Sequence, residues 1–339
     1  MTETMLAALL TEDNAPLDLK QIDIPTPGKG EVLIKMESCG VCHTDIHFWK
    51  GEDELPRAKP AILGHEGVGT IVGLGADVVD GTETGQRVGV GFVFSACGTC
   101  RECRKGLETY CQDSRATGVD VEGCFAEYVV APSDWVTAIP ESLSSEEACP
   151  LLCAGVTAYS AVRKADIEPG SVVVVFGLGG LGQYAVQYAK LFGAKVIGID
   201  LDPKKHETAV SLGAHAAYAP GDEATEAIHA LGGADALLSF APAPQVFRSM
   251  FDLAAPTARF IQVALPDKPF SFKAAEIIDL GITIIGSADG TRLERDQVMQ
   301  LAEEGLVRST IKSTGFDNIN ETFRSLDQGE AEGRWVVNF

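Results

Sequence analysis

Four of the nine cysteines form the most specific chemical pattern in this chain of 339 residues. They are Cys97, Cys100, Cys103 and Cys111, and they fall within fifteen consecutive residues. Four thiolates at this spacing can close a tetrahedral zinc site that holds together a loop with little core of its own. An iron–sulfur cluster is the chemical alternative, and chance clustering in a cysteine-rich chain is the other. The short lobe between expected strands favours a structural zinc.

A second group of possible ligands begins at residues 39–47, which read C-G-V-C-H-T-D-I-H. C-x-x-C-H is formally a haem-attachment pattern, but haem attachment belongs with exported chains and we expect no export signal here. A redox-active cysteine pair would need a thioredoxin-like βαβ unit, which the neighbouring sequence does not predict. The third interpretation takes one of the two cysteines as a metal ligand.

Further ligands for such a metal are available elsewhere in the chain. His65 and Glu66 lie on a glycine-flanked turn, and Cys153 follows later. A set of Cys, His and Cys leaves the fourth tetrahedral position free for water or substrate, as a catalytic zinc requires. The residues therefore predict a catalytic metal site beside the structural one.

A glycine-rich turn from Gly177 to Gly182 indicates a different chemistry, the binding of a dinucleotide. It follows a run of β-branched and apolar residues typical of a buried parallel strand, and a helical pattern comes directly after it. Gly177 permits the tight turn, Gly179 lets the backbone approach a pyrophosphate, and Gly182 allows close packing of the helix on the strand. The N-terminus of the helix would present free N–H groups to the phosphates. Because strand, glycines and helix occur together, a plain turn is the weaker interpretation.

Asp200 ends the next predicted strand, eighteen residues after Gly182. Its carboxylate can accept hydrogen bonds from the adenosine ribose and would repel a 2′-phosphate, which favours NAD. Lys204 and Lys205 follow closely and keep NADP as the alternative.

The composition is that of a soluble globular protein, with 45% hydrophobic and 22% charged residues. The length predicts two domains rather than one core. The net charge of −21 argues against nucleic acids and anionic membranes as partners. We expect neither a secretory signal nor a membrane span, and hence a cytoplasmic location in which the cysteines serve purposes other than disulfides.

The elements that position these groups change in character along the chain. Up to about residue 150, short alternating apolar runs are separated by turn-forming residues, which predicts a mostly β, barrel-like domain. From about residue 150 to about residue 286, helical and strand patterns alternate, which predicts a nucleotide-binding domain around a parallel sheet.

The order of these motifs resembles that of a known family. Five motifs follow one another in the family's order, and the resemblance covers essentially the full length of the chain. They are the string C-G-V-C-H-T-D-x-H, the G-H-E-G turn, the four-cysteine lobe, C-A-G-V-T at 153–157 and the glycine-rich segment. The chain is thereby similar to the zinc-dependent alcohol dehydrogenases of the medium-chain dehydrogenase/reductase superfamily, in their yeast and bacterial tetrameric branch. The resemblance implies an α/β fold that combines a Rossmann doubly wound parallel sheet with a mostly β, GroES-like catalytic domain.

The resemblance also implies where the domains begin and end. Residues 1–149 would form the catalytic domain, with the structural zinc lobe at about 95–113. Residues 150–286 would form the NAD-binding domain. Residues 287–339 would return to the catalytic domain, since G-R-W-V-V near the end matches the closing strand of the family.

Roles for single residues follow from the same resemblance. The catalytic zinc ligands that it implies are Cys42, His65 and Cys153, with the four clustered cysteines holding the structural zinc. Glu66 is the carboxylate that can approach the metal, and Asp45 would orient His65 by a hydrogen bond to its other ring nitrogen. Thr44 and His47 match the proton relay of the family.

The cofactor contacts that the resemblance and the glycine motif imply lie in both predicted domains. They are Gly177, Gly179, Gly180, Leu181, Gly182, Asp200, Lys205, Thr157, Val263, Leu265, Arg334 and His43. Trp49 and Phe92 are the expected walls of the substrate pocket. Asp53 falls about where the relatives have an aromatic residue, which allows a wider or more polar pocket than ethanol needs.

The expected activity is that of an alcohol dehydrogenase that uses two zinc ions and NAD. It would transfer hydride reversibly between NAD and a primary or small secondary alcohol, or the corresponding aldehyde or ketone. The alternatives are a polyol dehydrogenase of the same superfamily, an NADP-linked carbonyl reductase, or a nucleotide-binding relative without activity. Retention of Cys153 argues against the first of these, and the complete ligand set argues against the last. By analogy with short members of the family, we expect a homo-tetramer.

Overall fold

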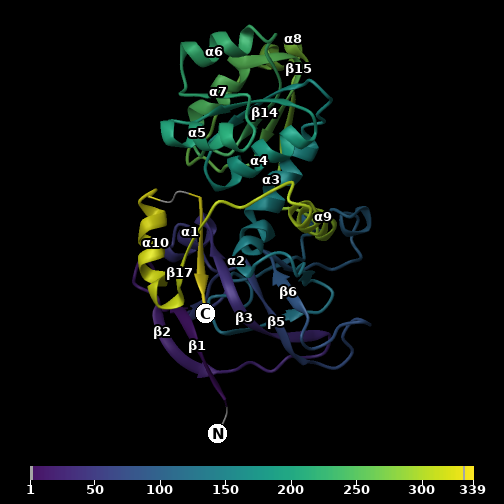
Figure 1. Cartoon of the computed structure of the whole chain (residues 1–339), viewed down its shortest axis with the longest axis vertical. Helices are drawn as coiled ribbons and strands as arrows, with labels where there is room; N and C mark the ends of the chain where they lie inside the picture. The colour runs from purple at the N-terminus through teal and green to yellow at the C-terminus, as the bar shows by residue number, and fades with distance from the viewer. Residues whose placement is uncertain (1–2, 331–332) are drawn as a thin grey trace. The chain divides into compact units, whose positions relative to one another are not determined.

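The computed structural model describes residues 3–330 and 333–339 and separates into two compact units. The first unit comprises Met1–Val156 and Gly290–Phe339, and the second comprises Thr157–Asp289. The chain leaves the first unit once and returns to it, so the N-terminal strands and the C-terminal strand share one unit (Figure 1).

The first unit is built mainly from short strands with a few helices. Its strands are β1 (Thr4–Leu10), β2 (Asp18–Asp23), β3 (Glu31–Val41), β4 (Ala61–Ile62), β5 (Gly67–Leu74), β6 (Arg87–Val90), β7 (Val93–Ser95), β8 (Arg115–Ala116), β9 (Tyr128–Pro132), β10 (Thr137–Ala138), β17 (Ile311–Gly315) and β18 (Arg334–Asn338). Its helices are α1 (His43–Lys50), η1 (Cys103–Lys105), η2 (Glu108–Tyr110), α2 (Ser145–Ala148), η3 (Cys149–Leu152), α9 (Arg292–Glu303), η4 (Phe316–Asn318) and α10 (Ile319–Asp327), and α3 (Ala154–Lys164) begins here.

β3 is the central strand of this unit. It pairs antiparallel with β5, β9 and β18, and these strands belong to a seven-stranded sheet. Its last four residues, up to Val41, are all buried, and it leads directly into α1. β18 pairs with this end of β3, placing Trp335 opposite Val41. The sheet therefore fixes both the start of α1 and the position of the C-terminal strand beside it.

The second unit alternates strands and helices. Its strands are β11 (Val172–Phe176), β12 (Lys195–Ile199), β13 (Ala216–Tyr218), β14 (Ala234–Ser239), β15 (Ala254–Gln262) and β16 (Thr283–Gly286). Its helices are α4 (Gly180–Leu191), α5 (Pro203–Ser211), α6 (Asp222–His229), α7 (Pro244–Leu253) and α8 (Ala274–Leu280).

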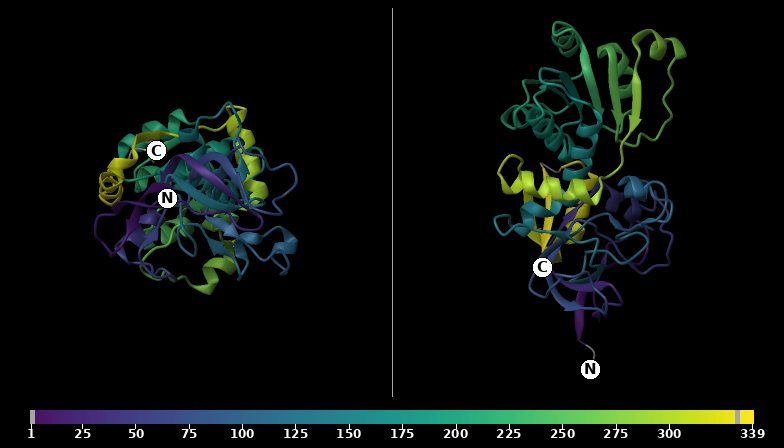
Figure 2. Two further views of the ribbon diagram at one scale, coloured as in Figure 1. Left: turned by 90° about the horizontal axis from the view of Figure 1, so that it is seen from below. Right: turned by 90° about the vertical axis from the view of Figure 1, so that its right-hand side faces the viewer.

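All strand pairs in the second unit are parallel, and the sheet order is β13-β12-β11-β14-β15-β16. The chain starts in the middle at β11, builds to the edge at β13 and then crosses to β14, which is the doubly wound pattern. Helices lie on both sides of the sheet, as Figure 2 shows in its right-hand view. All five residues of β11 are buried, which explains their unbroken apolar run. The predicted doubly wound parallel sheet and mostly β unit are confirmed.

The core of the second unit is aromatic on the side of α6 and α7. Phe247 and Phe251 of α7 meet the ring of Phe260 edge on, at centroid distances of 6.0 and 4.8 Å.

Among the residues that the structure describes, no helix is long and apolar enough to cross a membrane.

Candidate active site

Four potential metal ligands converge in the first unit from three separate segments. Cys42 caps the N-terminus of α1, His65 and Glu66 lie between β4 and β5, and Cys153 lies between η3 and α3. One ligand atom from each of these residues lies within 4.8 Å of the others. The Sγ atoms of Cys42 and Cys153 are 3.9 Å apart. Two sulfurs that share a tetrahedral zinc at ~2.3 Å each would be about 3.8 Å apart, so the spacing suits the metal and is far too long for a disulfide.

Asp45 links two of these segments by hydrogen bonds to its carboxylate. Its Oδ1 accepts hydrogen bonds from the Gly64 N–H and from His65 Nδ1, each at 3.1 Å, and its Oδ2 accepts one from the Cys42 N–H at 2.9 Å. Both Asp45 and His65 are almost completely buried. A carboxylate that accepts the Nδ1 proton leaves Nε2 of the imidazole as the ligand atom.

The donor set has the properties that a zinc ion requires. Among the described residues, His65 Nε2 is a buried nitrogen with no hydrogen-bond partner, which is the condition of an atom meant for a metal. The hydrogen bond from Cys153, together with His65, lowers the pKa of the Cys42 thiol well below its usual value. The site therefore favours a thiolate at Cys42, which is the form that binds metal. Residues Cys42, His65 and Cys153 fit a zinc ion.

Glu66 and Arg334 form a buried ion pair next to these ligands. Arg334 Nη2 donates to Glu66 Oε1, and the Glu66 side chain is fully buried. Burial raises the pKa of Glu66 to about 7 against the opposing effect of Arg334. Glu66 Oε2 has no hydrogen-bond partner among the described residues, so this oxygen remains available within the ligand cluster. Arg334, predicted as a cofactor contact, lies in the first unit and binds Glu66.

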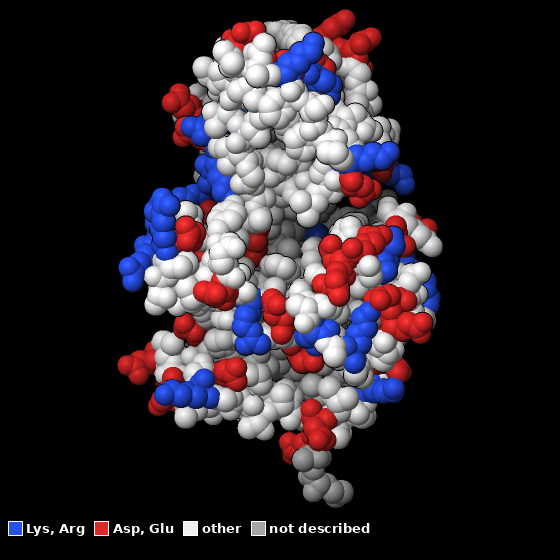
Figure 3. Space-filling view, turned by 180° about the vertical axis from the view of Figure 1, so that it is seen from behind, with Lys and Arg blue, Asp and Glu red and all other residues white. Residues whose placement is uncertain are grey.

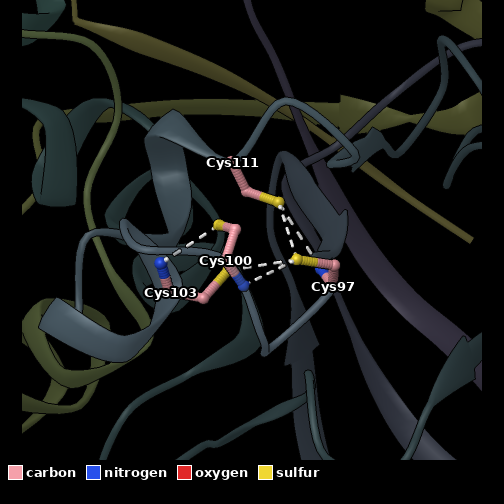
Figure 4. Close-up of side chains that lie close together, drawn as sticks. All are labelled: Cys97, Cys100, Cys103 and Cys111. Carbon is pink, nitrogen blue, oxygen red and sulfur yellow. Dashed lines mark hydrogen bonds between the residues drawn. The ribbon is translucent and has the colours of Figure 1, made fainter.

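The four-cysteine lobe brings its side chains together as the spacing predicts. Figure 4 shows the four sulfur-bearing side chains pointing toward one another. Cys97 Sγ lies 3.9 Å from Cys103 Sγ and 3.6 Å from Cys111 Sγ, again close to the separation across a zinc ion and not that of a disulfide. The N–H groups of Thr99 and Cys100 lower the pKa of the Cys97 thiol to about 6, which favours the thiolate.

The lobe has little apolar core, as expected for a segment that a metal holds together. Within η1 and η2, Glu108 is the one buried residue. Its Oε1 accepts the N–H of Arg292 at 2.9 Å, at the start of α9. Thr109 Oγ1 donates to the carbonyl of Gly290 at 2.9 Å. The lobe is therefore tied to the segment through which the chain re-enters the first unit.

The two predicted pocket residues have different positions. The ring of Phe92 packs edge on against the His65 ring at a centroid distance of 5.1 Å, beside the ligand cluster. Trp49, predicted as a pocket wall, has its indole in the core of the unit. It donates its Nε1–H to the Ala15 carbonyl at 2.6 Å and meets the ring of Phe323 edge on at 5.8 Å. Trp49 faces α10 because it lies on the inner side of α1.

Thr44 and His47 occupy successive turns of α1, three residues apart. Thr44 Oγ1 lies 3.7 Å from Cys42 Sγ, at the edge of the ligand cluster. His47 is half exposed, and its Nδ1 lies 2.6 Å from Glu52 Oε2. His43, predicted to approach the pyrophosphate, is exposed in the first turn of the same helix.

Glu52 is the one residue at this helix that sequence reasoning missed. The available signal was Gly51, a helix-stopping residue that turns the chain back over the last turn of α1.

The glycine-rich loop of the second unit has the geometry that its motif predicts. Gly177 has φ 85°, the left-handed conformation that favours glycine. A Cβ atom at Gly182 would collide with the carbonyl oxygen of Gly177, so only glycine lets α4 pack this closely. Around Gly179 a Cβ atom would meet no atom within 4 Å, so the backbone there is open. Gly180 and Leu181 begin α4 directly after it.

Asp200 follows β12 directly and accepts a hydrogen bond from the backbone of this loop. Its Oδ2 accepts the Leu178 N–H at 2.7 Å, and its Oδ1 accepts the Asp202 N–H at 3.0 Å. Lys205 Nζ lies 3.6 Å from Oδ1. The carboxylate is therefore held in place beside the loop by the backbone, with a lysine next to it.

The remaining predicted cofactor residues are spread over the second unit. Thr157 is buried in α3. Val263 follows β15 and donates its N–H to the Ser239 carbonyl at 3.1 Å, which places it at the end of β14. Leu265 is 87% exposed, so its side chain is not part of the core of this unit.

Comparisons with known proteins agree with this geometry. Residues 28–141 match the family described as "Alcohol dehydrogenase GroES-like domain", and residues 180–304 match "Zinc-binding dehydrogenase". The chain is 40% identical over 337 residues to an alcohol dehydrogenase of Moraxella sp. (strain TAE123), covering 99% of each chain.

Solved structures with similar folds cover almost all of the chain. The alcohol dehydrogenase of the hyperthermophilic archaeon Aeropyrum pernix has a TM-score of 0.89 at 32% identity, covering 98% of this chain and all of that one. The acetophenone reductase of Geotrichum candidum, solved in complex with NAD, also has a TM-score of 0.89, at 29% identity, covering 100% of this chain and 98% of that one.

Proposed function

The chain belongs to the zinc-dependent alcohol dehydrogenases of the medium-chain dehydrogenase/reductase superfamily, and from this premise we propose its cofactor, substrates and site residues. The reaction is a reversible hydride transfer between NAD and a primary or small secondary alcohol, or the matching aldehyde or ketone. The observation that carries this proposal is the cluster of Cys42, His65 and Cys153, which offers two sulfur atoms and an imidazole nitrogen with no hydrogen-bond partner among the described residues.

The division of roles follows the two units. We assign the first unit as the catalytic domain and the second as the NAD-binding domain, in a cytoplasmic homo-tetramer. Zinc at Cys42, His65 and Cys153 supplies Lewis-acid polarisation of the substrate oxygen, and NAD supplies the carbon that accepts hydride. A second zinc at the four-cysteine lobe has a structural role.

The residues around the ligands orient them and move the proton. Asp45 fixes the ring of His65 so that Nε2 faces the cluster. Thr44, next to Cys42, is placed to take the proton of the alcohol while it passes its own hydroxyl proton on, and His47 lies at the surface to release a proton to water. A bound cofactor would supply a hydroxyl between them. Glu66 lies within the ligand cluster, and its Oε2, which has no hydrogen-bond partner among the described residues, would be available as a further oxygen ligand for the metal.

NAD rather than NADP is supported by the fixed position of Asp200. A carboxylate held by two backbone N–H groups cannot turn away from a 2′-phosphate, so the repulsion persists. Lys205 Nζ lies 3.6 Å from Asp200 Oδ1 and weakens this repulsion. The related acetophenone reductase was solved with NAD, which agrees with this choice.

The experiment is a steady-state assay of the zinc-loaded enzyme with a panel of alcohols and carbonyls and with both cofactors. We expect kcat/KM to be highest for small primary or secondary alcohols with NAD. A preference for NADP would refute the role of Asp200, and activity confined to polyols would refute the substrate class. Metal analysis of the same sample should give two zinc ions per chain.

A further inference from the structure

His47 has a hydrogen-bond partner that the motif around Thr44 does not include. Its Nδ1 lies 2.6 Å from Oε2 of Glu52, five residues later. Both side chains are about half exposed, at 51% and 46%, so a chance encounter of two mobile surface groups is the first alternative. The backbone around the pair argues against chance.

The end of α1 positions Glu52 above His47. Gly51 has φ 71° and φ/ψ values in the left-handed region, and its N–H bonds to the Phe48 carbonyl at 3.2 Å. The Glu52 N–H bonds to the His47 carbonyl at 3.0 Å. These two bonds form the Schellman motif, which turns the chain back over the last helical turn. A Cβ atom at Gly51 would come within 2.8 Å of Asp13 Cγ, so a larger residue would not fit at this turn without a shift of Asp13.

Among the residues that the structure describes, His47 joins one short chain of ion pairs. Glu52 uses Oε2 for His47 and Oε1 for Lys50, whose Nζ lies at 2.8 Å. Lys50 also bonds to Asp327 at the end of α10, at 3.1 Å. His43, in the first turn of α1, is the other titratable group on this side of the helix. Glu52 is thus shared between two partners: Oε1 pairs with Lys50, and Oε2 is left for the imidazole.

We propose that Glu52 positions His47 for proton release, by accepting its Nδ1–H and so keeping Nε2 as the nitrogen that takes the proton. This inference rests on the proposed role of His47 in carrying the alcohol's proton to the surface. In that step an O–H bond on the substrate side breaks and an Nε2–H bond forms. The imidazolium then gives a proton to solvent water and returns to its starting tautomer. Glu52 stabilises the imidazolium while it exists and remains ionised throughout.

Glu52→Ala removes the acceptor, and Glu54→Ala removes a nearby acid of the same loop as the matched control. An exposed carboxylate–imidazole pair contributes only a small interaction free energy. We therefore expect kcat/KM for alcohol oxidation to fall about two- to fivefold near and below neutral pH. The loss should shrink at high pH, where hydroxide can take the proton. Glu52→Asp should recover part of the activity, and Glu54→Ala should match the wild type.

A double-mutant cycle with His47→Gln separates positioning from a structural role. If Glu52 acts through the imidazole, Glu52→Ala should have no further effect once His47 is glutamine. An equal loss in both backgrounds would overturn the inference, as would a normal pH profile of Glu52→Ala beside an impaired His47→Gln. If His47→Gln itself has no pH-dependent effect, the relay proposal fails and this inference fails with it.

A readout that does not depend on turnover is the tautomer of the ring. The chain has six histidines, so nitrogen-15 spectra of histidine-labelled protein can be assigned by comparison with His47→Gln. We expect a protonated Nδ1 and a bare Nε2 in the wild type at high pH. Glu52→Ala should shift the ring toward the Nε2–H tautomer, which is the commoner form without a partner on Nδ1. Identical His47 signals in both proteins would overturn the proposal.

Discussion

At the scale of single residues, we expect Asp45 to affect the zinc affinity of the catalytic site more than the stability of the fold. Its carboxylate accepts hydrogen bonds from His65 Nδ1 and from two backbone N–H groups near the ligands. Asp45→Asn keeps the size but loses the charge, and we expect zinc at the catalytic site to bind 10–100-fold more weakly. Competition with a chelator of known affinity measures this directly.

The control for Asp45→Asn is Asp53→Asn, an exposed acid of the following loop. Zinc affinity of the control should be that of the wild type, and the four-cysteine site should be filled in both variants. Equal zinc affinity of Asp45→Asn and wild type would contradict the orienting role.

Asp200 is the second residue whose role can be isolated, and the structure decides which substitution to use. Glycine would remove the two backbone hydrogen bonds that shape the loop, together with the charge. Asp200→Asn removes the charge and keeps an acceptor. We expect KM for NAD to rise roughly tenfold, because a hydrogen bond to a charged acceptor is lost, and KM for NADP to fall.

Glu207→Gln is the matched control for this substitution, since Glu207 is an exposed acid of α5. Its effect on the ratio of kcat/KM for NAD and NADP should be negligible. Should Asp200→Asn leave that ratio unchanged, another group selects the cofactor.

At the scale of elements, the four-cysteine lobe depends on its metal. Glu108 is the one buried residue of η1 and η2, so little apolar surface holds these turns together. Cys103→Ser should lose one of two zinc ions per chain, lower the thermal midpoint by several degrees and open the lobe to proteases. Metal content, a melting curve and limited proteolysis test this.

Lys105→Ala, an exposed change in the same lobe, should behave like the wild type in all three measurements. Because Glu108 and Thr109 bond to the start of α9, cleavage after Cys103→Ser should also extend to residues near 290. Retention of both zinc ions by Cys103→Ser would contradict the assignment.

How far sequence predicted these elements depends on whether their information is local. The glycine-rich turn and the four-cysteine lobe are each encoded by consecutive residues, so spacing alone indicated their chemistry. The ion pair of Glu66 with Arg334 joins residues 268 positions apart, and only the pairing of β18 with β3 brings them together. No local pattern contains that information.

Trp49 shows the same limit on a short helix. Its place after the H-T-D-x-H string indicated a pocket wall, but the side of α1 that faces inward is set by packing against α10. Phe92 lies two residues after β6, and β6 ends with Val90 paired to Gly67, next to the ligand turn. Its ring therefore reaches His65. Side-chain direction on a short helix depends on tertiary contacts that a sequence does not list.

At the scale of the whole molecule, the net charge of −21 opposes folding. The chain has 48 acidic and 27 basic residues, so 48 − 27 = 21 acids have no basic counterpart. Figure 3 shows acidic groups distributed over the visible face with basic groups among them. Compaction brings these charges together, and the folded state is destabilised by their repulsion.

Added salt should therefore stabilise this protein, although it weakens exposed ion pairs such as Lys29–Asp77. Such a pair contributes at most ~1 kcal/mol. Because the net charge of −21 remains however the pairs are arranged, we expect relief of repulsion to outweigh the loss of these pairs. The Debye length falls from ~30 Å at 0.01 M to ~8 Å at 0.15 M salt, so most of the effect should appear within that range. We expect the thermal midpoint of the zinc-loaded protein to rise by roughly 2–6 °C and then to level off.

The shape of the curve distinguishes screening from a general salt effect. Exclusion of salt from the protein surface grows steadily with concentration, whereas screening saturates once the Debye length is shorter than the spacing of surface charges. Melting curves in sodium chloride and in choline chloride, from 0.01 to 1 M with zinc held constant, should therefore coincide and flatten. A midpoint that falls with salt would show that the surface ion pairs outweigh the repulsion. A midpoint that rises linearly to 1 M would show that the charge excess has little effect on stability.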